Sequence, residues 1–248
     1  MYINAHEHLS HYPSMKNAIH PQYITLANTV NDADFCRTLK LRQPNVLIGY
    51  GIHPWEVTSH TDLTKTDLYV QQADFIGEVG LDYLWAKNKA AYPYQREVFE
   101  HFVILSKKHH KFLNIHTKDA EQDVLSILKF HEATHGIIHW YSGPLNLVDE
   151  FLDLGYYFTI SVDAGYSTLT DQLIDHLPLS RLLTEIDGPE ALEWVNGHLG
   201  GPEYIPTLVQ YIAKRKRLDS TDVEKALYQN LLNLLNEYQL VNRLKHVE

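Results

Sequence analysis

Short runs of apolar, strand-forming residues recur along the chain, and most are almost continuously apolar rather than alternating with polar residues. Such runs are typical of strands that are covered on both faces, as in parallel sheets. The pattern predicts eight strands, at Tyr2–Ile3, Tyr23–Leu26, Val46–Tyr50, Phe75–Ile76, Phe112–Ile115, Gly136–His139, Tyr156–Val162 and Leu182–Ile186.

Helical patterns separate many of these runs. Pro93 suits the first turn of one helix, a second helix is expected after Asp119, and Thr221–Glu224 has the form of a capping box that begins the last. The helical pattern is thin before Asp62. Eight strands alternating with helices predict an α/β fold of the TIM-type (β/α)8 barrel class. Because no linker, repeat or low-complexity segment divides the chain, we expect one domain over residues 1–248.

Composition narrows the function classes. The chain has 248 residues and a formal net charge of −10, which argues against binding nucleic acid through a broad basic surface. A single cysteine excludes an internal disulfide framework. No apolar run approaches a membrane span, and the first residues lack the pattern of a signal peptide. We therefore expect a cytoplasmic protein without membrane association, and no obligate protein partner is indicated.

Histidine is abundant, with 16 residues, and five of these fall at the ends of predicted strands. In a barrel of this class the active site is built at the carboxyl ends of the strands. Residues able to bind metal or substrate lie at seven of the eight predicted strand ends; the main ones are His6, His8, His53, Glu78, Asp82, His116, Lys118, His139, Asp163 and Asp187. We interpret the remaining histidines as surface residues that have no functional role.

His6 and His8 are the strongest local signal. In an extended segment residues i and i+2 face the same way, so both imidazoles can reach one ion. The alternative is a pair of surface histidines in a loop. Asp187 ends the eighth strand, which lies beside the first in a closed barrel. It either completes the shell of that ion, serves as a general base, or simply forms a turn before Gly188 and Pro189.

Glu78 follows an apolar strand, and a carboxylate near a barrel interior is unfavourable unless it is paired or bound to metal. No basic residue lies from Thr66 to Ala86, which favours a metal over a local ion pair. Its two oxygens can bridge two cations. His116 and His139 each end a strongly apolar strand. One such histidine alone is more often a core residue whose ring nitrogens are hydrogen-bonded. The two together favour a set of metal ligands.

Taken in order, these residues resemble the TatD-type deoxyribonuclease family of metal-dependent hydrolases on the amidohydrolase-like barrel. The resemblance covers nearly the whole chain. The matching pieces are His6-x-His8, Gly51-Ile-His53-Pro54, Gly77-Glu78-Val79-Gly80-Leu81-Asp82-Tyr83, Gln95 with Phe99, His116-x-Lys118-Asp119-Ala120, His139-x-x-Ser142-Gly143, Glu185-x-Asp187-x-Pro189 and the closing helix with Asn230.

The resemblance implies a TIM-type barrel with two divalent ions at its mouth. It implies one ion held by His6, His8, Glu78 and Asp187, and a second held by the bridging Glu78 with His116 and His139. It also implies that His53 and Lys118 lie near the substrate phosphate. Two residues depart from the family pattern: Asn4 stands where the family usually has Asp, and Lys118 where it usually has Arg. Lysine keeps the charge but loses the two-pronged grip on phosphate.

The expected activity is metal-assisted hydrolysis of a phosphodiester, most simply by a deoxyribonuclease acting from a DNA end, with Glu78 and Asp187 as catalytic carboxylates. Two divalent ions, zinc, manganese or magnesium, would give the site a positive net charge that suits an anionic substrate. One alternative is an enzyme that cleaves a small amide, lactone or phosphoester on the same scaffold. The other is a metal-binding or partner protein that has lost activity.

Overall fold

The computed structural model describes residues 1–86 and 88–244. Within them, eight strands follow one another in a single sheet in chain order, and every strand pairing resolved in it is parallel. The strands are β1 (Tyr2–Glu7), β2 (Tyr23–Ala27), β3 (Val46–Tyr50), β4 (Phe75–Asp82), β5 (Leu113–Lys118), β6 (Ile137–Ile138), β7 (Tyr157–Ile160) and β8 (Leu182–Thr184). This order, with helices between strands, confirms the predicted TIM-type (β/α)8 barrel class.

Nine α-helices lie within the same described residues. They are α1 (Asp32–Thr38), α2 (Thr66–Gln72), α3 (Tyr92–His109), α4 (Glu121–Phe130), α5 (Val148–Asp153), α6 (Thr168–His176), α7 (Ala191–Asn196), α8 (Ile205–Lys216) and α9 (Ser220–Glu237). The helices predicted at Pro93 and after Asp119 are confirmed as α3 and α4. The predicted capping box is wrong, because α9 begins earlier and Asp219 caps it by accepting a hydrogen bond from the Thr221 amide.

By contacts the chain divides into two units. Unit 1 comprises Met1–Ala27, Leu41–Leu47 and Phe158–Glu248, and unit 2 comprises Asn28–Lys40 and Ile48–Tyr157. The single domain over residues 1–248 stays a prediction. No helix in the described part of the chain is long and apolar enough to cross a membrane.

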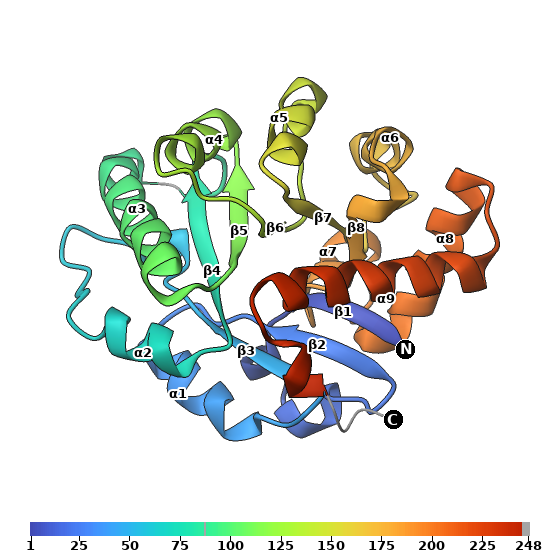
Figure 1. Cartoon of the computed structure of the whole chain (residues 1–248), viewed down its shortest axis with the longest axis horizontal. Coiled ribbons are helices and arrows are strands. Elements are labelled where there is room, and N and C mark those ends of the chain that lie inside the picture. The colour runs from blue at the N-terminus through green and yellow to red at the C-terminus, as the bar shows by residue number, and fades with distance from the viewer. Residues whose placement is uncertain (87, 245–248) are drawn as a thin grey trace. The chain divides into compact units, whose positions relative to one another are not determined.

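Unit 1 joins the two ends of the chain. β1 pairs with β2, and the Thr184 hydroxyl on β8 donates a hydrogen bond to the Ile3 carbonyl on β1 at 2.6 Å. Helix α9 packs on both β1 and β8 (Figure 1). Its buried Asn230 donates hydrogen bonds to the carbonyls of Leu179 and Leu182, both at 2.8 Å. The last helix therefore fixes the strands whose ends carry the first candidate ligands.

Unit 2 is built around β4, which pairs with β3 and β5 and is covered by α3 (Figure 1). Gly80 allows β4 and β5 to approach closely. A Cβ there would lie 1.9 Å from the His116 carbonyl oxygen, and the φ of Gly80 is +149°, which side chains rarely adopt. The glycine in the Glu78–Asp82 segment is thus needed to place Glu78 beside His116.

Several strands run further than their apolar patterns predicted. β1 continues from Ile3 through Glu7, β4 from Ile76 through Asp82, and β5 from Ile115 through Lys118. The polar residues of these segments therefore lie within strands rather than in loops after them. Backbone pairing with the neighbouring strand, such as Asp82 with Lys118, extends the strand regardless of side-chain polarity.

Candidate metal centre

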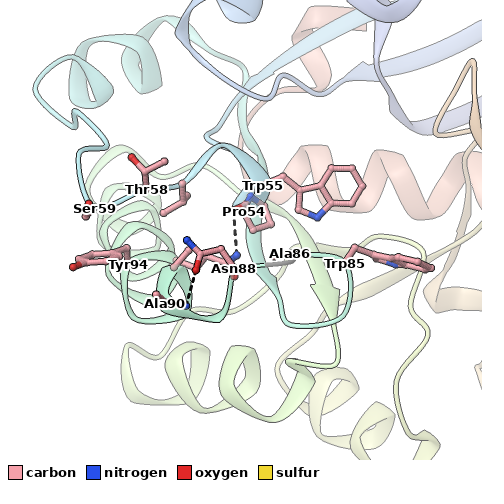
Figure 2. A pocket seen from close by; sticks show the side chains of 12 residues that line it. Pro54, Trp55, Thr58, Ser59, Trp85, Ala86, Asn88, Ala90 and Tyr94 are labelled. Atoms are coloured by element: carbon pink, nitrogen blue, oxygen red, sulfur yellow. Dashed lines mark hydrogen bonds between the residues drawn. The ribbon is translucent and has the colours of Figure 1, made fainter.

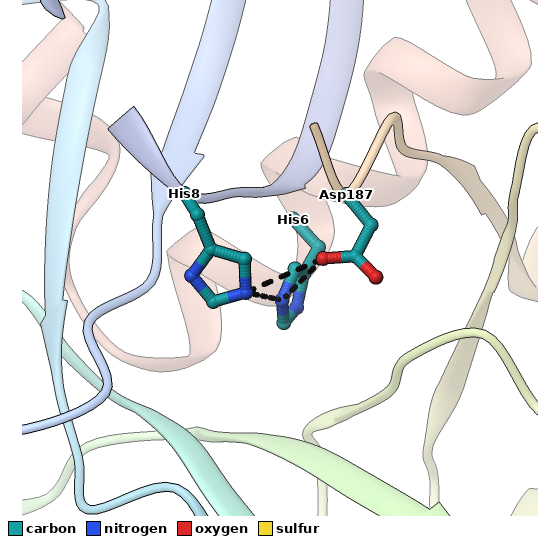
Figure 3. Close-up of side chains that lie close together, drawn as sticks. All are labelled: His6, His8 and Asp187. Carbon is teal, nitrogen blue, oxygen red and sulfur yellow. Dashed lines mark hydrogen bonds and ion pairs between the residues drawn. The ribbon is translucent and has the colours of Figure 1, made fainter. Parts of the chain in front are cut away.

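The first candidate ligand group lies in unit 1 and consists of His6, His8 and Asp187 (Figure 3). His6 Nε2 lies 3.3 Å from His8 Nε2, and Asp187 Oδ1 lies 3.6 Å from His6 Nε2 and 3.3 Å from His8 Nε2. The backbone joins the two segments, because the Asp187 amide donates a hydrogen bond to the His6 carbonyl at 3.1 Å. The three donor atoms thus face one point from opposite ends of the chain.

These spacings fit a divalent ion. A tetrahedral ion bound at about 2.0–2.1 Å sets neighbouring donor atoms roughly 3.3–3.4 Å apart. Imidazole nitrogens and a carboxylate oxygen are also the ligand types preferred by zinc and related ions. Both imidazoles are buried, and the Asp187 side chain is 13% exposed. The residues present therefore fit a metal ion on distance and on donor chemistry.

Asn4 and Glu7 hold the backbone on either side of Asp187. The Ile186 amide donates to Asn4 Oδ1 at 3.0 Å, and the Gly188 amide donates to Glu7 Oε1 at 2.9 Å. Asn4 Nδ2 in turn donates to Glu7 Oε2 at 2.6 Å. Asp187 itself has a φ of +50°, a conformation that aspartate tolerates better than most residues. Two side chains of β1 thus fix the turn that presents the carboxylate.

Glu7 is completely buried. Burial raises the pKa of its carboxyl group to about 7, against the opposing effects of the hydrogen bond from Asn4 and the nearby His8. Its two oxygens accept hydrogen bonds from Asn4 Nδ2 and from the Gly188 amide. Glu7 therefore supports the ligand group through the turn that carries Asp187.

The second candidate group lies in unit 2, where three imidazoles surround one oxygen of Glu78. Glu78 Oε1 lies 2.8 Å from His116 Nδ1, 3.1 Å from His139 Nε2 and 3.3 Å from His53 Nε2. Glu78 and His139 are almost completely buried, and His53 and His116 are nearly so. Ring nitrogens at this spacing around a carboxylate also form a donor set that suits a divalent ion.

His116 lies between two carboxylates, with Nε2 2.9 Å from Asp82 Oδ2 and Nδ1 2.8 Å from Glu78 Oε1. The tautomer with its proton on Nε2, donated to Asp82, leaves the lone pair of Nδ1 facing Glu78, as a metal ligand requires. Burial raises the pKa of Asp82, but hydrogen bonds from His116, the Trp85 amide and Trp55 outweigh burial and hold it well below its usual range. Asp82 thus stays ionised.

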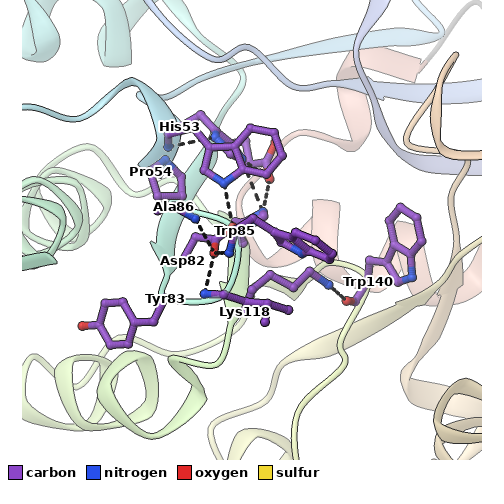
Figure 4. A network of polar contacts seen from close by, with 12 residues as sticks. His53, Pro54, Asp82, Tyr83, Trp85, Ala86, Lys118 and Trp140 are labelled. Carbon is purple, nitrogen blue, oxygen red and sulfur yellow. Dashed lines mark hydrogen bonds and ion pairs between the residues drawn. The ribbon is translucent and has the colours of Figure 1, made fainter. Parts of the chain in front are cut away.

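His53, which precedes Pro54 (Figure 4), has a different hydrogen-bond partner. Its Nδ1 accepts a hydrogen bond from the Trp55 amide at 3.1 Å, which leaves the proton of the neutral ring on Nε2. A ring in this state is a hydrogen-bond donor at Nε2 rather than a metal ligand. His53 and His116 therefore differ in their hydrogen-bonding roles, although both lie beside Glu78.

Lys118 lies two residues after His116 on β5. Its ammonium group donates hydrogen bonds to the Trp140 carbonyl and to Ser142 Oγ, the latter at 3.2 Å, and lies 5.4 Å from the centre of the Trp140 ring. The side chain extends toward Trp140 in Figure 4. A buried cation held at a strand end is suited to an anionic group of a substrate.

The structure thus brings His6, His8 and Asp187 together in unit 1, and Glu78, His53, His116 and His139 together in unit 2. Sequence reasoning missed the roles of Glu7, Trp55 and Asp82. Asp82 had a detectable signal, because Glu78, Gly80 and Asp82 alternate along one strand and face the same side. Glu7 had none, since its backbone partner Gly188 lies 181 residues away.

Comparison with known proteins identifies the family. The family model for TatD related DNase matches residues 5–236. An uncharacterized metal-dependent hydrolase of Methanocaldococcus jannaschii is 27% identical over 92% of this chain and 94% of its own. The uncharacterized metal-dependent hydrolase YcfH of Escherichia coli is 25% identical over 86% of this chain and 82% of its own.

Solved structures show the same fold. The TatD homolog YjjV of Escherichia coli has a TM-score of 0.83 at 21% identity, over 95% of this chain and 98% of its own. A TatD family hydrolase of Entamoeba histolytica has a TM-score of 0.77 at 17% identity, over 94% of this chain and 97% of its own. The chain therefore belongs to the TatD related DNase family, with the TIM-type barrel fold of that family, and is a metal-dependent hydrolase.

Proposed function

We propose that this hydrolase is a deoxyribonuclease that cleaves phosphodiester bonds from a DNA end. The observation that carries the proposal is the presence of groups of histidine and carboxylate ligands, one around Asp187 and one around Glu78, in a chain of a family described as TatD related DNase. Pairs of divalent ions are a recurring solution for phosphodiester hydrolysis, because they stabilise charge on both the attacking and the leaving oxygen.

In this proposal His6, His8 and Asp187 hold one ion, and Glu78, His116 and His139 hold the other. The predicted bridging of both ions by Glu78 stays a prediction. Histidine-rich shells favour zinc or manganese, while magnesium prefers oxygen ligands and stays a candidate through the family resemblance. When bound, the ions make water more acidic and polarise the phosphoryl group.

The residues around the ions have separable tasks. Asp187 is partly exposed, and its carboxylate accepts the proton that the attacking water releases. His53 donates Nε2–H to a non-bridging phosphate oxygen, and Lys118 offers an ammonium group to another. Asp82 keeps His116 in the tautomer that a ligand needs. A positive local charge at these groups admits an anionic substrate even though the whole chain carries −10.

The test uses protein stripped of metal and reloaded with zinc, manganese or magnesium. Single- and double-stranded DNA, labelled at either end, is followed with time. We expect mononucleotides to accumulate only in reloaded protein, and Glu78→Ala to reduce the rate at least a thousandfold. Glu97→Ala, which removes an exposed carboxylate on α3, is the matched control. Undiminished cleavage by the Glu78→Ala variant would contradict the role given to Glu78.

The acidic net charge supports a second candidate, a hydrolase of a small amide, lactone or phosphoester. A panel of chromogenic amides, lactones, phosphotriesters and phosphodiesters separates the two. Faster turnover of a neutral substrate than of any phosphodiester would favour the small-molecule enzyme. A protein that binds no divalent ion would instead favour a partner protein that has lost activity.

A further inference from the structure

All four tryptophans of the chain lie in segments that follow the carboxyl end of a strand. Trp55 follows β3, Trp85 follows β4, Trp140 follows β6 and Trp194 follows β8. Three of these, Trp55, Trp85 and Trp140, belong to unit 2. Indole side chains are usually largely buried, yet Trp55 is 53% and Trp85 62% exposed. Exposed rings at the functional end of a barrel point to a ligand.

Trp55 and Trp85 line a pocket of about 620 Å³ in unit 2 (Figure 2). Tyr94 lies at one end of the pocket, and Trp85 lies toward the other. Thr58, Ser59 and Asn88 also line the pocket, and their hydroxyl and amide side chains supply polar groups. This volume is in the range of pockets that hold one nucleoside-sized ligand. Flat apolar walls with a few polar groups suit a planar heteroaromatic ring.

A single carboxylate connects this pocket to the second ligand group. Asp82 Oδ2 accepts hydrogen bonds from Trp55 Nε1 at 2.6 Å and from His116 Nε2 at 2.9 Å. Asp82 Oδ1 accepts the amides of Leu84 at 2.9 Å and Trp85 at 2.6 Å (Figure 4). The rings of His53 and Trp55 are 4.9 Å apart. The pocket wall is therefore held directly against the residues that surround Glu78.

The charge distribution around the pocket suits a nucleotide. Lys118, on the strand beside Asp82, carries an ammonium group for phosphate, and none of the described residues that line the pocket is acidic. Stacking on an indole ring binds any base, because every base has an aromatic face. A paired base cannot enter such a pocket without leaving its partner. The occupant is thus an unpaired base beside the phosphate that is cleaved.

We propose that Trp55 and Trp85 form a binding site for the unpaired nucleobase of the nucleotide at the cleaved end. The proposal rests on the phosphodiesterase activity proposed above and adds a base-recognition site to it. Trp85 forms the main stacking surface, because its ring is the more exposed of the two indoles and only its backbone is tied to Asp82. Trp55, whose ring is fixed by Asp82, is the rigid wall.

The experiment compares two substrates that share one scissile bond. Thymidine 5′-(p-nitrophenyl phosphate) carries a base, whereas methyl p-nitrophenyl phosphate does not. In wild-type protein we expect kcat/KM to be higher for the thymidine ester. Trp85→Ala should reduce the ratio of the two kcat/KM values about tenfold, because one stacked base contributes about 1–3 kcal/mol. Trp85→Phe, which keeps a ring, should restore at least part of that ratio.

Phe130→Ala is the matched control, since Phe130 is an even more exposed aromatic residue of unit 2 that ends α4, ahead of a strand. It should leave the ratio unchanged. An equal loss on both substrates in Trp85→Ala, or an unchanged ratio, would overturn the base site. Thermal unfolding of each variant shows whether a loss of activity results from misfolding. If Trp85→Ala is misfolded, the ratio of kcat/KM values measured for Trp85→Phe tests the proposal.

A binding measurement separates failure of this site from failure of the proposed activity. Thymidine 5′-monophosphate and methyl phosphate are titrated into the metal-loaded full chain by calorimetry. Preferential binding of the thymidine compound that is lost in Trp85→Ala supports the site even if no phosphodiester is hydrolysed. Equal affinity for the two compounds overturns the site, whether or not DNA is cleaved.

Discussion

The Asn4 side chain donates a hydrogen bond from Nδ2 to Glu7 Oε2 at 2.6 Å, within a fully buried part of β1. The family pattern usually places an aspartate where this chain has Asn4. Here the carboxylate stands three residues later, and an amide at position 4 complements it. Together the two side chains bind the amides on both sides of Asp187.

Asn4→Asp should therefore be harmful although it restores the residue that the family usually has. Two buried carboxyl groups would face each other at hydrogen-bond distance, and one must take up a proton or repel the other. We expect a loss of about 2–3 kcal/mol in the free energy of unfolding at neutral pH. Zinc affinity, measured by competition with a chelating dye, should fall at least tenfold.

The double variant Asn4→Asp with Glu7→Gln exchanges the acid and the amide and should recover most of both losses. Urea unfolding and zinc competition measure the recovery. A double variant that is no better than Asn4→Asp alone would show that the two residues do not act as a pair.

Asp82→Ala should weaken metal binding without removing a ligand. His116 would lose the acceptor of its Nε2–H, so its ring and tautomer would no longer be fixed toward Glu78. Loss of such an outer carboxylate typically reduces metal affinity about 10–100-fold. Asp123→Ala, which removes a half-buried carboxylate paired with Arg96, serves as the control. Equal metal affinity in both variants would contradict this role of Asp82.

His53 and His116 should respond differently to substitution, although both contact Glu78. His116→Ala should reduce the number of ions that the protein retains, as measured by mass spectrometry of dialysed protein. His53→Ala should retain the wild-type number and instead lower kcat/KM about a hundredfold, because in the proposed function its Nε2–H donates to the substrate phosphate. Loss of an ion from the His53→Ala protein would show that His53 is a ligand.

Glu121→Gln tests a buried carboxyl group at the start of α4. Burial raises the pKa of Glu121 above its usual 4.5, against hydrogen bonds from the backbone and the nearby Lys118. The unfolded chain releases this proton near pH 4.5, while the folded protein holds it to higher pH. The contribution of Glu121 to stability is therefore complete below pH 4.5 and is lost as pH rises through the folded pKa.

Urea unfolding of the wild type and of Glu121→Gln between pH 4 and pH 8 checks this direction. The stability of the wild type relative to the variant should decrease with rising pH. A difference that is constant, or that increases with pH, would mean that the carboxyl group is ionised as readily in the folded protein as in the unfolded chain.

Gly80→Ala should destabilise the protein severely, by about 4 kcal/mol or more, because the added Cβ collides with the His116 backbone and β4 and β5 must separate. Gly197→Ala is the matched comparison. Gly197 also has a positive φ, of +82°, but no atom lies within 4 Å of its Cβ position. Strain alone should lower its stability by only about 1–2 kcal/mol. Similar losses, measured by thermal unfolding, would exclude the close approach as the cause.

Much of the fold was predictable because strand signals are local. The runs at Val46–Tyr50 and Tyr23–Leu26 match β3 and all but the last residue of β2. Strand ends were less predictable. β4 extends to Asp82 because pairing with β5 continues beyond its apolar residues, and this pairing is a property of two distant segments.

The sequence by itself determined which residues carry the chemistry. Alternation along one strand places His6 and His8 on one side, and the absence of nearby basic residues marks Glu78. Tertiary structure alone decided that Asp187 joins His6 and His8, and that Asn4 and Glu7 hold its turn. It also decided that Asp82 lies at hydrogen-bond distance from His116 Nε2, while the Trp55 amide donates to His53 Nδ1. The physical reason is that a side-chain pattern fixes direction within a segment, whereas a proton's position depends on the partner that packing supplies.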